Sequence, residues 1–196
     1  PEAIVQYLEE NFFRSNELSG KSVLISAGPT YEAIDPVRFI GNHSSGKMGY
    51  ALAEAFYEKG ATVHLVSGPS KQQPKYDGIQ ITNVTSAEEM FNACTGLFEK
   101  ADITVMSAAI ADYTPQSKAN EKIKKHTDDF NLHLVKTKDV LKSLGEKKHN
   151  GQVLVGFALE TDNEVANALL KITSKNLDFV VLNSLNDKGA GFAYDT

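Results

Sequence analysis

The chain has 196 residues, 41% of them hydrophobic and 23% charged, which is typical of one folded domain with a sizeable core. Its formal net charge of −5 argues against a general nucleic-acid-binding protein, which carries a strongly positive balance. The apolar runs are no longer than a strand, so we expect no segment that spans a membrane.

Cys94 is the only cysteine, which excludes an internal disulfide and suits a reducing cytoplasm. It falls within a helical pattern, so we interpret it as a small core residue and not as a nucleophile. The chain begins at Pro1 without a Met and stops at Thr196 in loop-like sequence. We therefore expect a piece of a longer protein without a targeting signal.

Strand and helix signals alternate from the start of the chain to its end. β-prone runs predict strands at 22–26, 62–66, 79–84, 103–106, 132–135, 152–157 and 179–182. Helical patterns cover 1–13, 46–59, 86–100, a short stretch from 139, and 162–176. Residues 109–129 are predicted to form a polar loop. Strands that alternate with helices imply right-handed βαβ units and an α/β, Rossmann-like, mostly parallel sheet flanked by helices.

Three helices carry local signals. The first has Ile4, Val5, Leu8 and Phe12 on one stripe, which indicates an amphipathic helix. The helix over 46–59 is followed by Gly60, a favoured C-terminal cap. The sequence from Ser86 to Glu89 is a capping box and predicts the start of the next helix.

The loop from Asn42 to Gly49 is rich in Gly and Ser and leads directly into a helix. Such a loop lets backbone N–H groups and a helix N-terminus approach a phosphate. Its sequence from Gly41 to Lys47 also matches the start of a P-loop, but Met48 stands where a P-loop needs Ser or Thr for magnesium. The sequence therefore disfavours a P-loop.

Lysines cluster in the second half of the chain. The clustered lysines are Lys118, Lys122, Lys124, Lys125, Lys136, Lys138, Lys171 and Lys175. On an acidic chain, such clusters favour a small polyanion such as a nucleoside triphosphate. Taken singly, each lysine is explained equally well as a solvated surface residue.

A Rossmann-like sheet also suggests an NAD(P)-type oxidoreductase. The first strand-to-helix turn, however, has a lone Gly28 in place of G-x-G-x-x-G, and the second strand ends in Val66 and Ser67 without an acidic residue for the ribose. No Tyr is followed four residues later by Lys, as in short-chain dehydrogenases. These features disfavour dinucleotide binding.

Seven motifs follow one another in a specific order. They are Ala27–Glu32, Ile34–Arg38, Asn42–Gly49, Ala108–Tyr113, Glu121–Lys125, Gly156–Thr161 and the pair Lys171 and Lys175. Together they resemble the phosphopantothenate–cysteine ligase family, specifically the C-terminal ligase half of the bacterial bifunctional forms. The resemblance covers residues from about 20 to 192.

The resemblance implies a ligase that works in two steps. The carboxylate of 4′-phosphopantothenate attacks the α-phosphate of a nucleoside triphosphate, with Mg²⁺, and the amine of L-cysteine then attacks the acyl-nucleotidylate. The loop containing His43 looks like that of the bacterial form, which implies CTP in preference to ATP. The resemblance also implies a cytoplasmic homodimer, paired through part of its sheet and an extended arm, and a fused decarboxylase domain that carries FMN.

Site residues follow from the same resemblance. Asn42 is expected to serve the second step, and Lys122 is expected to contact the triphosphate. The expected nucleotide contacts are Gly28, Ser107, Ala108, Asp112, Lys122, Asp139, Val140, Phe157, Lys171 and Lys175. The expected contacts to the substrate phosphate are Ser44, Ser45, Gly46 and Lys47. No metal ligand is assigned, and on residue type alone Phe157 is also explained as a core aromatic and Asp112 as a loop-capping carboxylate.

Two positions depart from the family pattern: Lys138 stands where Pro is usual, and Ser184 stands where Asp is usual. We expect residues 1–196 to form one ligase domain that lacks its C-terminal part, with residues 1–20 as helix and linker from an absent flavoprotein domain. The remaining alternative is a catalytically inactive, nucleotide-binding regulatory domain. That alternative predicts loss of the polar site residues, which are present.

Overall fold

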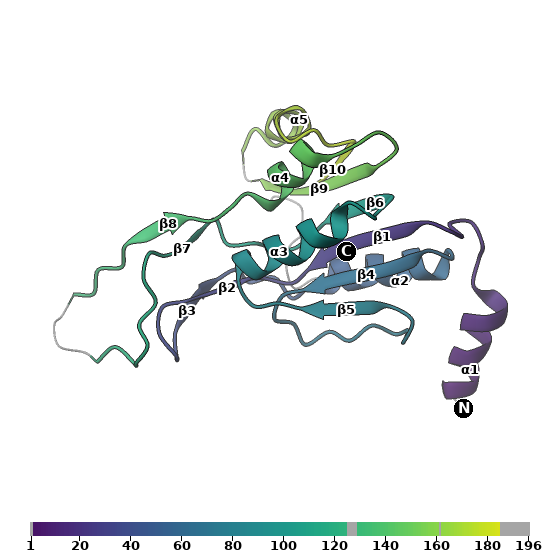
Figure 1. Cartoon of the computed structure of the whole chain (residues 1–196), viewed down its shortest axis with the longest axis horizontal. Coiled ribbons are helices and arrows are strands. Elements are labelled where there is room, and N and C mark those ends of the chain that lie inside the picture. Colours follow the sequence, from purple (N-terminus) through teal and green to yellow (C-terminus); the bar gives the residue numbers. More distant parts are fainter. Residues whose placement is uncertain (1, 125–128, 161, 185–196) are drawn as a thin grey trace.

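The computed structural model describes residues 2–124, 129–160 and 162–184, and a six-stranded parallel sheet is its centre (Figure 1). The strand order is β10-β9-β6-β1-β4-β5. The strands are β1 (Ser22–Ala27), β4 (Thr62–Ser67), β5 (Gln80–Asn83), β6 (Ile103–Met106), β9 (Val153–Glu160) and β10 (Phe179–Ser184). All neighbours pair in parallel, which confirms the predicted α/β, Rossmann-like fold.

Helices cover both faces of this sheet. They are α2 (Lys47–Glu58), α3 (Ala87–Phe98), α4 (Val140–Lys147) and α5 (Glu164–Ser174), whereas α1 (Glu2–Leu8) and the π-helical turn η1 (Glu9–Phe13) lie beyond one end of the sheet. The predicted caps are confirmed: Gly60 has a φ of +95° after α2, and Ser86 and Glu89 form the reciprocal capping box of α3. No helix of the described part of the chain has the length and apolar character needed to cross a membrane.

Two hydrophobic layers form the core, one on each face of the sheet. Along β1, Val23 and Ile25 pack under α2, whereas Leu24 points to the layer under α3 and α4. Burial on both faces explains why the strands are continuous apolar runs. Cys94 lies fully buried in the α3 layer, and burial raises the pKa of its thiol to about 12, which confirms its assignment as a core residue.

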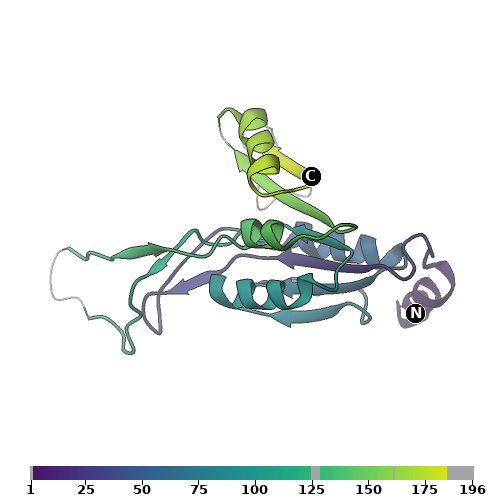
Figure 2. The same cartoon turned by 45° about the horizontal axis from the view of Figure 1, so that its top comes forward.

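Two short antiparallel pairs lie outside the main sheet. β2 (Tyr31–Ala33) pairs with β3 (Phe39–Gly41), and β7 (Tyr113–Pro115) pairs with β8 (Leu134–Lys136). Both pairs run away from the sheet as an arm in the two views (Figures 1 and 2). The polar loop predicted over 109–129 is therefore wrong in part, because it contains β7, and the strand predicted near 132–135 belongs to this arm.

The first helix also differs from its prediction. Its stripe is largely exposed, with 67% of Ile4 and 69% of Phe12 accessible to solvent. The amphipathic pattern therefore forms a helix without adding to the core.

Candidate functional site

The carboxyl ends of β1 and β6 lie level with each other, beside the middle of β9, which continues to Glu160. The register pairs Ser26 with Met106, and Met106 with Gly156, across β1, β6 and β9. Each next residue therefore lies in one row, which consists of Ala27, Ser107 and Phe157. Ligands of parallel α/β sheets bind just beyond such strand ends.

Glycines let the N-terminus of α2 approach this row. Gly28 and Gly46 both adopt positive φ, and a Cβ added to Gly46 would lie 3.3 Å from the Gly28 nitrogen. A Cβ added to Gly49 would lie 2.5 Å from Ala27 Cβ and 2.7 Å from Ser107 Oγ. The predicted phosphate loop therefore lies against the ends of β1 and β6.

The loop before α2 is held by its own serines. Ser44 Oγ accepts the Gly46 N–H at 3.3 Å, and Ser45 Oγ accepts the Lys47 N–H at 3.4 Å. The Ser45 carbonyl in turn accepts a hydrogen bond from the Ser70 hydroxyl at 2.7 Å. These contacts keep the first backbone N–H groups of α2 at the strand ends, while the Lys47 side chain is exposed.

Asn42 is tied to the loop that follows β6. Its Nδ2 donates to the Ala109 carbonyl at 3.0 Å, and the Ala109 N–H donates to the Gly28 carbonyl at 2.9 Å. The structure thus brings Asn42, Gly28 and the turn after Ser107 together, as the sequence predicts. These residues, with Ser44–Lys47 and Ala108, are called the first-turn cluster below.

Ser26, which the sequence analysis did not single out, holds the turn after β6. Its hydroxyl accepts the Ala108 N–H at 3.1 Å, and its carbonyl accepts the Ser107 hydroxyl at 2.6 Å. A buried serine at the end of an apolar strand is the one signal that could have revealed it. The nucleotide contacts assigned to Ser107 and Ala108 stay a prediction.

Asp112 is joined to the segment that leads to α4. Its carbonyl accepts the Thr137 N–H at 2.9 Å, and the Thr137 hydroxyl donates to the Ala111 carbonyl at 2.7 Å. The Asp112 side chain is exposed. Thr137 therefore places Asp112 beside the approach to Asp139, a link that sequence spacing does not reveal.

A second group joins α4 and α5 and is called the α4–α5 cluster. Asp139 is the N-cap of α4, where its Oδ1 accepts the Lys142 N–H at 2.9 Å, and its Oδ2 lies 2.8 Å from Lys175 Nζ. Lys171 Nζ donates to the Phe157 carbonyl at 3.2 Å. Lys171 in α5 and Lys175 directly after it thus lie beside Phe157 and Asp139, which are also predicted to contact the nucleotide.

The charge on Asp139 is stabilised inside this cluster. Burial acts to raise the pKa of Asp139, but the Lys175 ammonium and the Lys142 N–H outweigh it and hold the pKa below its usual range. Val140, the next residue, is buried under α4. Phe157 is half-buried against the α2 layer, so it contributes to the core as well as to the row with Ala27 and Ser107.

Lys138, which stands where the family resemblance expects Pro, directly precedes the N-cap of α4. Its ammonium lies 4.7 Å from the ring centre of Phe91 on α3, within range of a cation–π contact. Asp139, the next residue, caps α4 in this chain. The side chain of Ser184, the second departure, lies outside the described residues.

Lys122 lies on the arm and is not brought into either cluster. It is exposed in the segment between β7 and β8, which lies at the far end of the arm in both views (Figures 1 and 2). Its neighbour Ile123 is hydrogen-bonded to Asp35 and Arg38. Asp35 lies in the motif Ile34–Arg38, but the sequence predicts no role for it.

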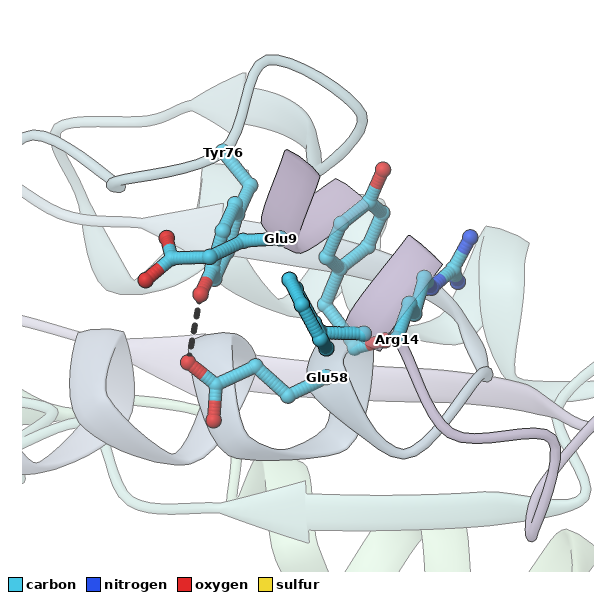
Figure 3. A pocket seen from close by; sticks show the side chains of 6 residues that line it. Glu9, Arg14, Glu58 and Tyr76 are labelled. Atoms are coloured by element: carbon cyan, nitrogen blue, oxygen red, sulfur yellow. Dashed lines mark hydrogen bonds between the residues drawn. The ribbon is translucent and has the colours of Figure 1, made fainter. Parts of the chain in front are cut away.

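Two pockets of the described residues are lined by side chains of α2. One, of about 260 Å³, adjoins the phosphate loop and is lined by Lys47, Tyr50, Ala51, Glu54, Gln72 and Gln73. The other, of about 270 Å³, is lined by Glu9, Phe13, Arg14, Tyr57, Glu58 and Tyr76. Figure 3 shows this second pocket, where the Tyr76 hydroxyl donates to Glu58 at 2.6 Å.

The pocket of Figure 3 lies at the wrong end of α2 for the strand-end site. It is formed at the C-terminal end of this 12-residue helix, about 18 Å from its N-terminus. Arg14 holds the N-terminal segment there by donating to the carbonyls of Tyr57 and Ala61 at 2.7 and 2.6 Å. Two carboxylates in the lining, Glu9 and Glu58, disfavour a polyphosphate in this pocket.

No group of three or more His, Cys, Asp or Glu that could hold a metal ion occurs within residues 2–124, 129–160 and 162–184. Asp112 and Asp139 are the two carboxylates among the residues predicted to contact the nucleotide. Asp139 is already engaged by Lys175.

Comparison with known proteins gives a family and several relatives. Residues 18–196 match the family described as DNA/pantothenate metabolism flavoprotein C-terminal domain. Coenzyme A biosynthesis bifunctional protein CoaBC of Bacillus subtilis (strain 168) is 48% identical over 200 residues, which are 100% of this chain and 48% of the relative. A cysteine/cysteine sulfinic acid decarboxylase from an unknown prokaryotic organism is 46% identical over 193 residues, 98% of this chain and 54% of the relative.

Solved structures agree with these relatives. The crystal structure of the C-terminal domain of Coenzyme A biosynthesis bifunctional protein CoaBC matches with a TM-score of 0.75 and 42% identity, covering 87% of this chain and 79% of that one. The chain spans about half the length of the curated relatives it matches.

Proposed function

Because the chain belongs to the DNA/pantothenate metabolism flavoprotein C-terminal domain family, we propose that it is the ligase that joins 4′-phosphopantothenate to L-cysteine in coenzyme A biosynthesis. The observation that carries the proposal is the convergence of Asn42 and the α2 N-terminus on the ends of β1 and β6, at Ala27 and Ser107. The whole protein in which this domain occurs is proposed to carry a decarboxylase domain with FMN as well.

In the first step, the carboxylate oxygen of 4′-phosphopantothenate forms a bond to the α-phosphorus, and the bond from that phosphorus to the β-phosphate breaks. Pyrophosphate leaves and an acyl-nucleotidylate remains. Two anions must approach each other, so cations and backbone N–H groups have to stabilise the charge that develops on the phosphates. We assign this role to Lys171 and Lys175 and, on the family resemblance alone, to Lys122, which a single chain carries on its arm away from these two lysines. The contact to the substrate phosphate is assigned to Ser44–Lys47.

In the second step, the amine of L-cysteine attacks the acyl carbon and releases the nucleoside monophosphate. An amide is no general base, so Asn42 acts as a hydrogen-bond donor to the carbonyl oxygen as negative charge develops there. The contact between Asn42 Nδ2 and the Ala109 carbonyl fixes the amide beside the strand ends.

We propose CTP as the nucleotide, with ATP as the alternative, because the loop containing His43 resembles that of the bacterial family members. Mg²⁺ fits a triphosphate bound to these lysines, because it takes most of its ligands from phosphate and water and needs only one or two carboxylates, such as Asp112. Bound Mg²⁺ would lower the repulsion between the two anions.

We propose further that the protein works as a cytoplasmic homodimer paired through its arm. Large apolar side chains of the arm are exposed, and they are Val37, Phe39, Tyr113, Phe130, Leu134 and Val135. Exposed apolar side chains gathered on one projecting element are typical of a protein interface.

Pyrophosphate release separates the ligase from the two alternatives. The wild-type chain should release pyrophosphate with 4′-phosphopantothenate and CTP in the absence of L-cysteine, and less with ATP.

Lys122→Gln should slow this release by about 10²-fold or more, since it removes a cation from the phosphates. Lys142→Gln is the matched control, because Lys142 is exposed and forms only a long 3.9 Å pair with Glu146. No release by the wild type with either nucleotide would favour the inactive nucleotide-binding domain, and reduction of NAD(P)⁺ would favour the oxidoreductase.

A further inference from the structure

Asp35 is the most heavily hydrogen-bonded carboxylate of the arm. It lies in the turn between β2 and β3, and its side chain is completely buried. Oδ1 accepts the N–H groups of Val37 and Arg38, both at 2.8 Å. Oδ2 accepts Arg38 Nε at 3.0 Å, a second contact from Arg38 Nη2, and the Ile123 N–H at 3.1 Å.

Arg38 completes the attachment of Ile123. While it pairs with Asp35, its Nη2 also donates to the Ile123 carbonyl at 2.8 Å. Both backbone polar groups of Ile123 therefore end on the Asp35–Arg38 pair. The Arg38 guanidinium, followed by the backbone N–H donors, holds the pKa of Asp35 well below its usual range, so the pair is ionised at neutral pH.

A second contact holds the same segment four residues earlier. The Ala119 N–H donates to the Ile34 carbonyl at 2.9 Å. The chain between Ala119 and Ile123 has no regular secondary structure, and Lys122 lies inside it. Lys122 is therefore carried by a short exposed stretch whose two ends are fixed to the β2–β3 turn.

We infer that Asp35 is a positioning residue that sets the place of Lys122 by fixing the backbone of Ile123. The inference rests on the proposed function, in which Lys122 stabilises charge on the phosphates. Errors of about 1 Å in the place of a catalytic group can cost about 10²-fold in rate, so an anchor next to the group is of direct use. The Arg38 side chain is 39% exposed, and an ion pair contributes little to stability compared with apolar packing, so a purely stabilising role is a poor explanation for this pair.

Asp35→Asn is expected to remove the contact to Ile123 while it keeps the contacts within the β2–β3 turn. The amide oxygen can still accept the N–H groups of Val37 and Arg38. The NH₂ group, however, faces the Ile123 N–H and the Arg38 guanidinium, so donors oppose donors. We expect this variant to keep its fold and to form the acyl-nucleotidylate about 10- to 100-fold more slowly in a single turnover, with the KM for 4′-phosphopantothenate little changed.

A double-mutant cycle tests whether Asp35 acts through Lys122. In a Lys122→Gln background, Asp35→Asn should add less than about threefold, because groups that act as a unit are not additive. Full additivity would overturn the inference and leave Asp35 with a role in the fold alone. Normal activation by Asp35→Asn would also overturn it, whereas no activation by the wild type would instead contradict the proposed function.

Asp102→Asn is the matched control. Asp102 also accepts a backbone N–H, from Ser22 at 2.8 Å, and pairs with Lys21 at 3.0 Å, but it lies at the opposite end of β1. This control should leave activation unchanged. Amide exchange gives a second measurement: the Ile123 N–H should be protected in the wild type and in Asp102→Asn, and should exchange faster in Asp35→Asn.

Arg38→Lys keeps the inference testable if Asp35→Asn does not fold. A lysine retains a cation beside Asp35 but lacks the second nitrogen that reaches the Ile123 carbonyl. We expect the same non-additivity with Lys122→Gln. Additive effects in this cycle would reject the anchor.

Discussion

Asn42 shows how one side chain can be fixed for one step of a reaction. Its Nδ2 donates to the Ala109 carbonyl, which lies in the loop that follows β6. In the proposed mechanism this amide donates to the acyl carbonyl beyond the strand ends, and it has no charge to offer to the first step.

Asn42→Asp should spare activation and block the second step. The carboxylate would place a negative charge where an oxyanion develops, and it would face the Ala109 carbonyl without a proton to donate. Loss of one such donor typically costs about 10²–10³ in rate. We expect the acyl-nucleotidylate to accumulate in the presence of L-cysteine, which mass spectrometry of the reaction mixture detects. Normal product formation would remove Asn42 from this role.

At the scale of elements, the approach of α2 to the sheet depends on a residue without a side chain. A Cβ on Gly49 would lie 3.0 Å from Ala27 Cα as well as 2.5 Å from Ala27 Cβ, and neither atom can move away without shifting β1. The helix N-terminus would then be pushed off the strand ends.

Gly49→Ala should accordingly destabilise the protein, by about 1–3 kcal/mol in the free energy of unfolding. Gly96→Ala is the natural comparison, because a Cβ on this glycine of α3 meets nothing within 4 Å. That change should instead stabilise by up to about 1 kcal/mol, through helix propensity alone. Urea denaturation of both variants measures the difference, and equal effects would contradict the close packing of α2.

Local patterns predicted the strands of the main sheet, but of the four strands of the arm they predicted only β8, near 132–135. Strands such as β1 and β4 are apolar runs of six residues bounded by Gly, which period and composition reveal. The four strands of the arm have only three residues each, too few for alternation to be recognised. Pro115 at the end of β7 further hides the strand, since proline is rare in sheets except at their edges.

At the scale of the whole molecule, several carboxylates tie stability to pH. Their pKa values are held below the ordinary value of about 3.9, and they are Asp35, Asp102, Asp139 and Asp178. A carboxyl group whose pKa is lower in the folded state contributes stability above its unfolded pKa. That contribution is lost as the pH falls through the folded value.

We therefore expect the free energy of unfolding to be nearly constant from pH 7 to pH 5 and to fall below about pH 4. Asp102→Asn should lose part of this dependence, because the Ser22 N–H and Lys21 no longer meet a charge. Urea unfolding at pH 7, 5, 4 and 3 measures both slopes. An identical slope for the variant and the wild type would show that Asp102 has no part in the acid response.

Much of the candidate site was visible in the sequence because it lies in contiguous motifs. Gly28, the loop before α2, and the lysines of α5 each follow a strand end or a helix turn. The contacts that join these motifs were not visible, since Ser26 with Ala108 and Asp35 with Ile123 bridge more than 80 positions. Only the folded chain shows which distant main-chain groups a buried hydroxyl or carboxylate meets.

The strand order has a consequence for how the chain assembles as it is synthesised. β1, β4 and β5 come from the first part of the chain and pair as a local unit, whereas β6, β9 and β10 add later, on the other side of β1. Until β6 emerges, one edge of the most buried strand has no partner and its hydrogen-bonding groups face solvent. An unpaired apolar edge invites association with other chains. The interval from the synthesis of β4 to that of β6 is therefore the one in which the nascent protein is most exposed to aggregation, and in which a chaperone has most to protect.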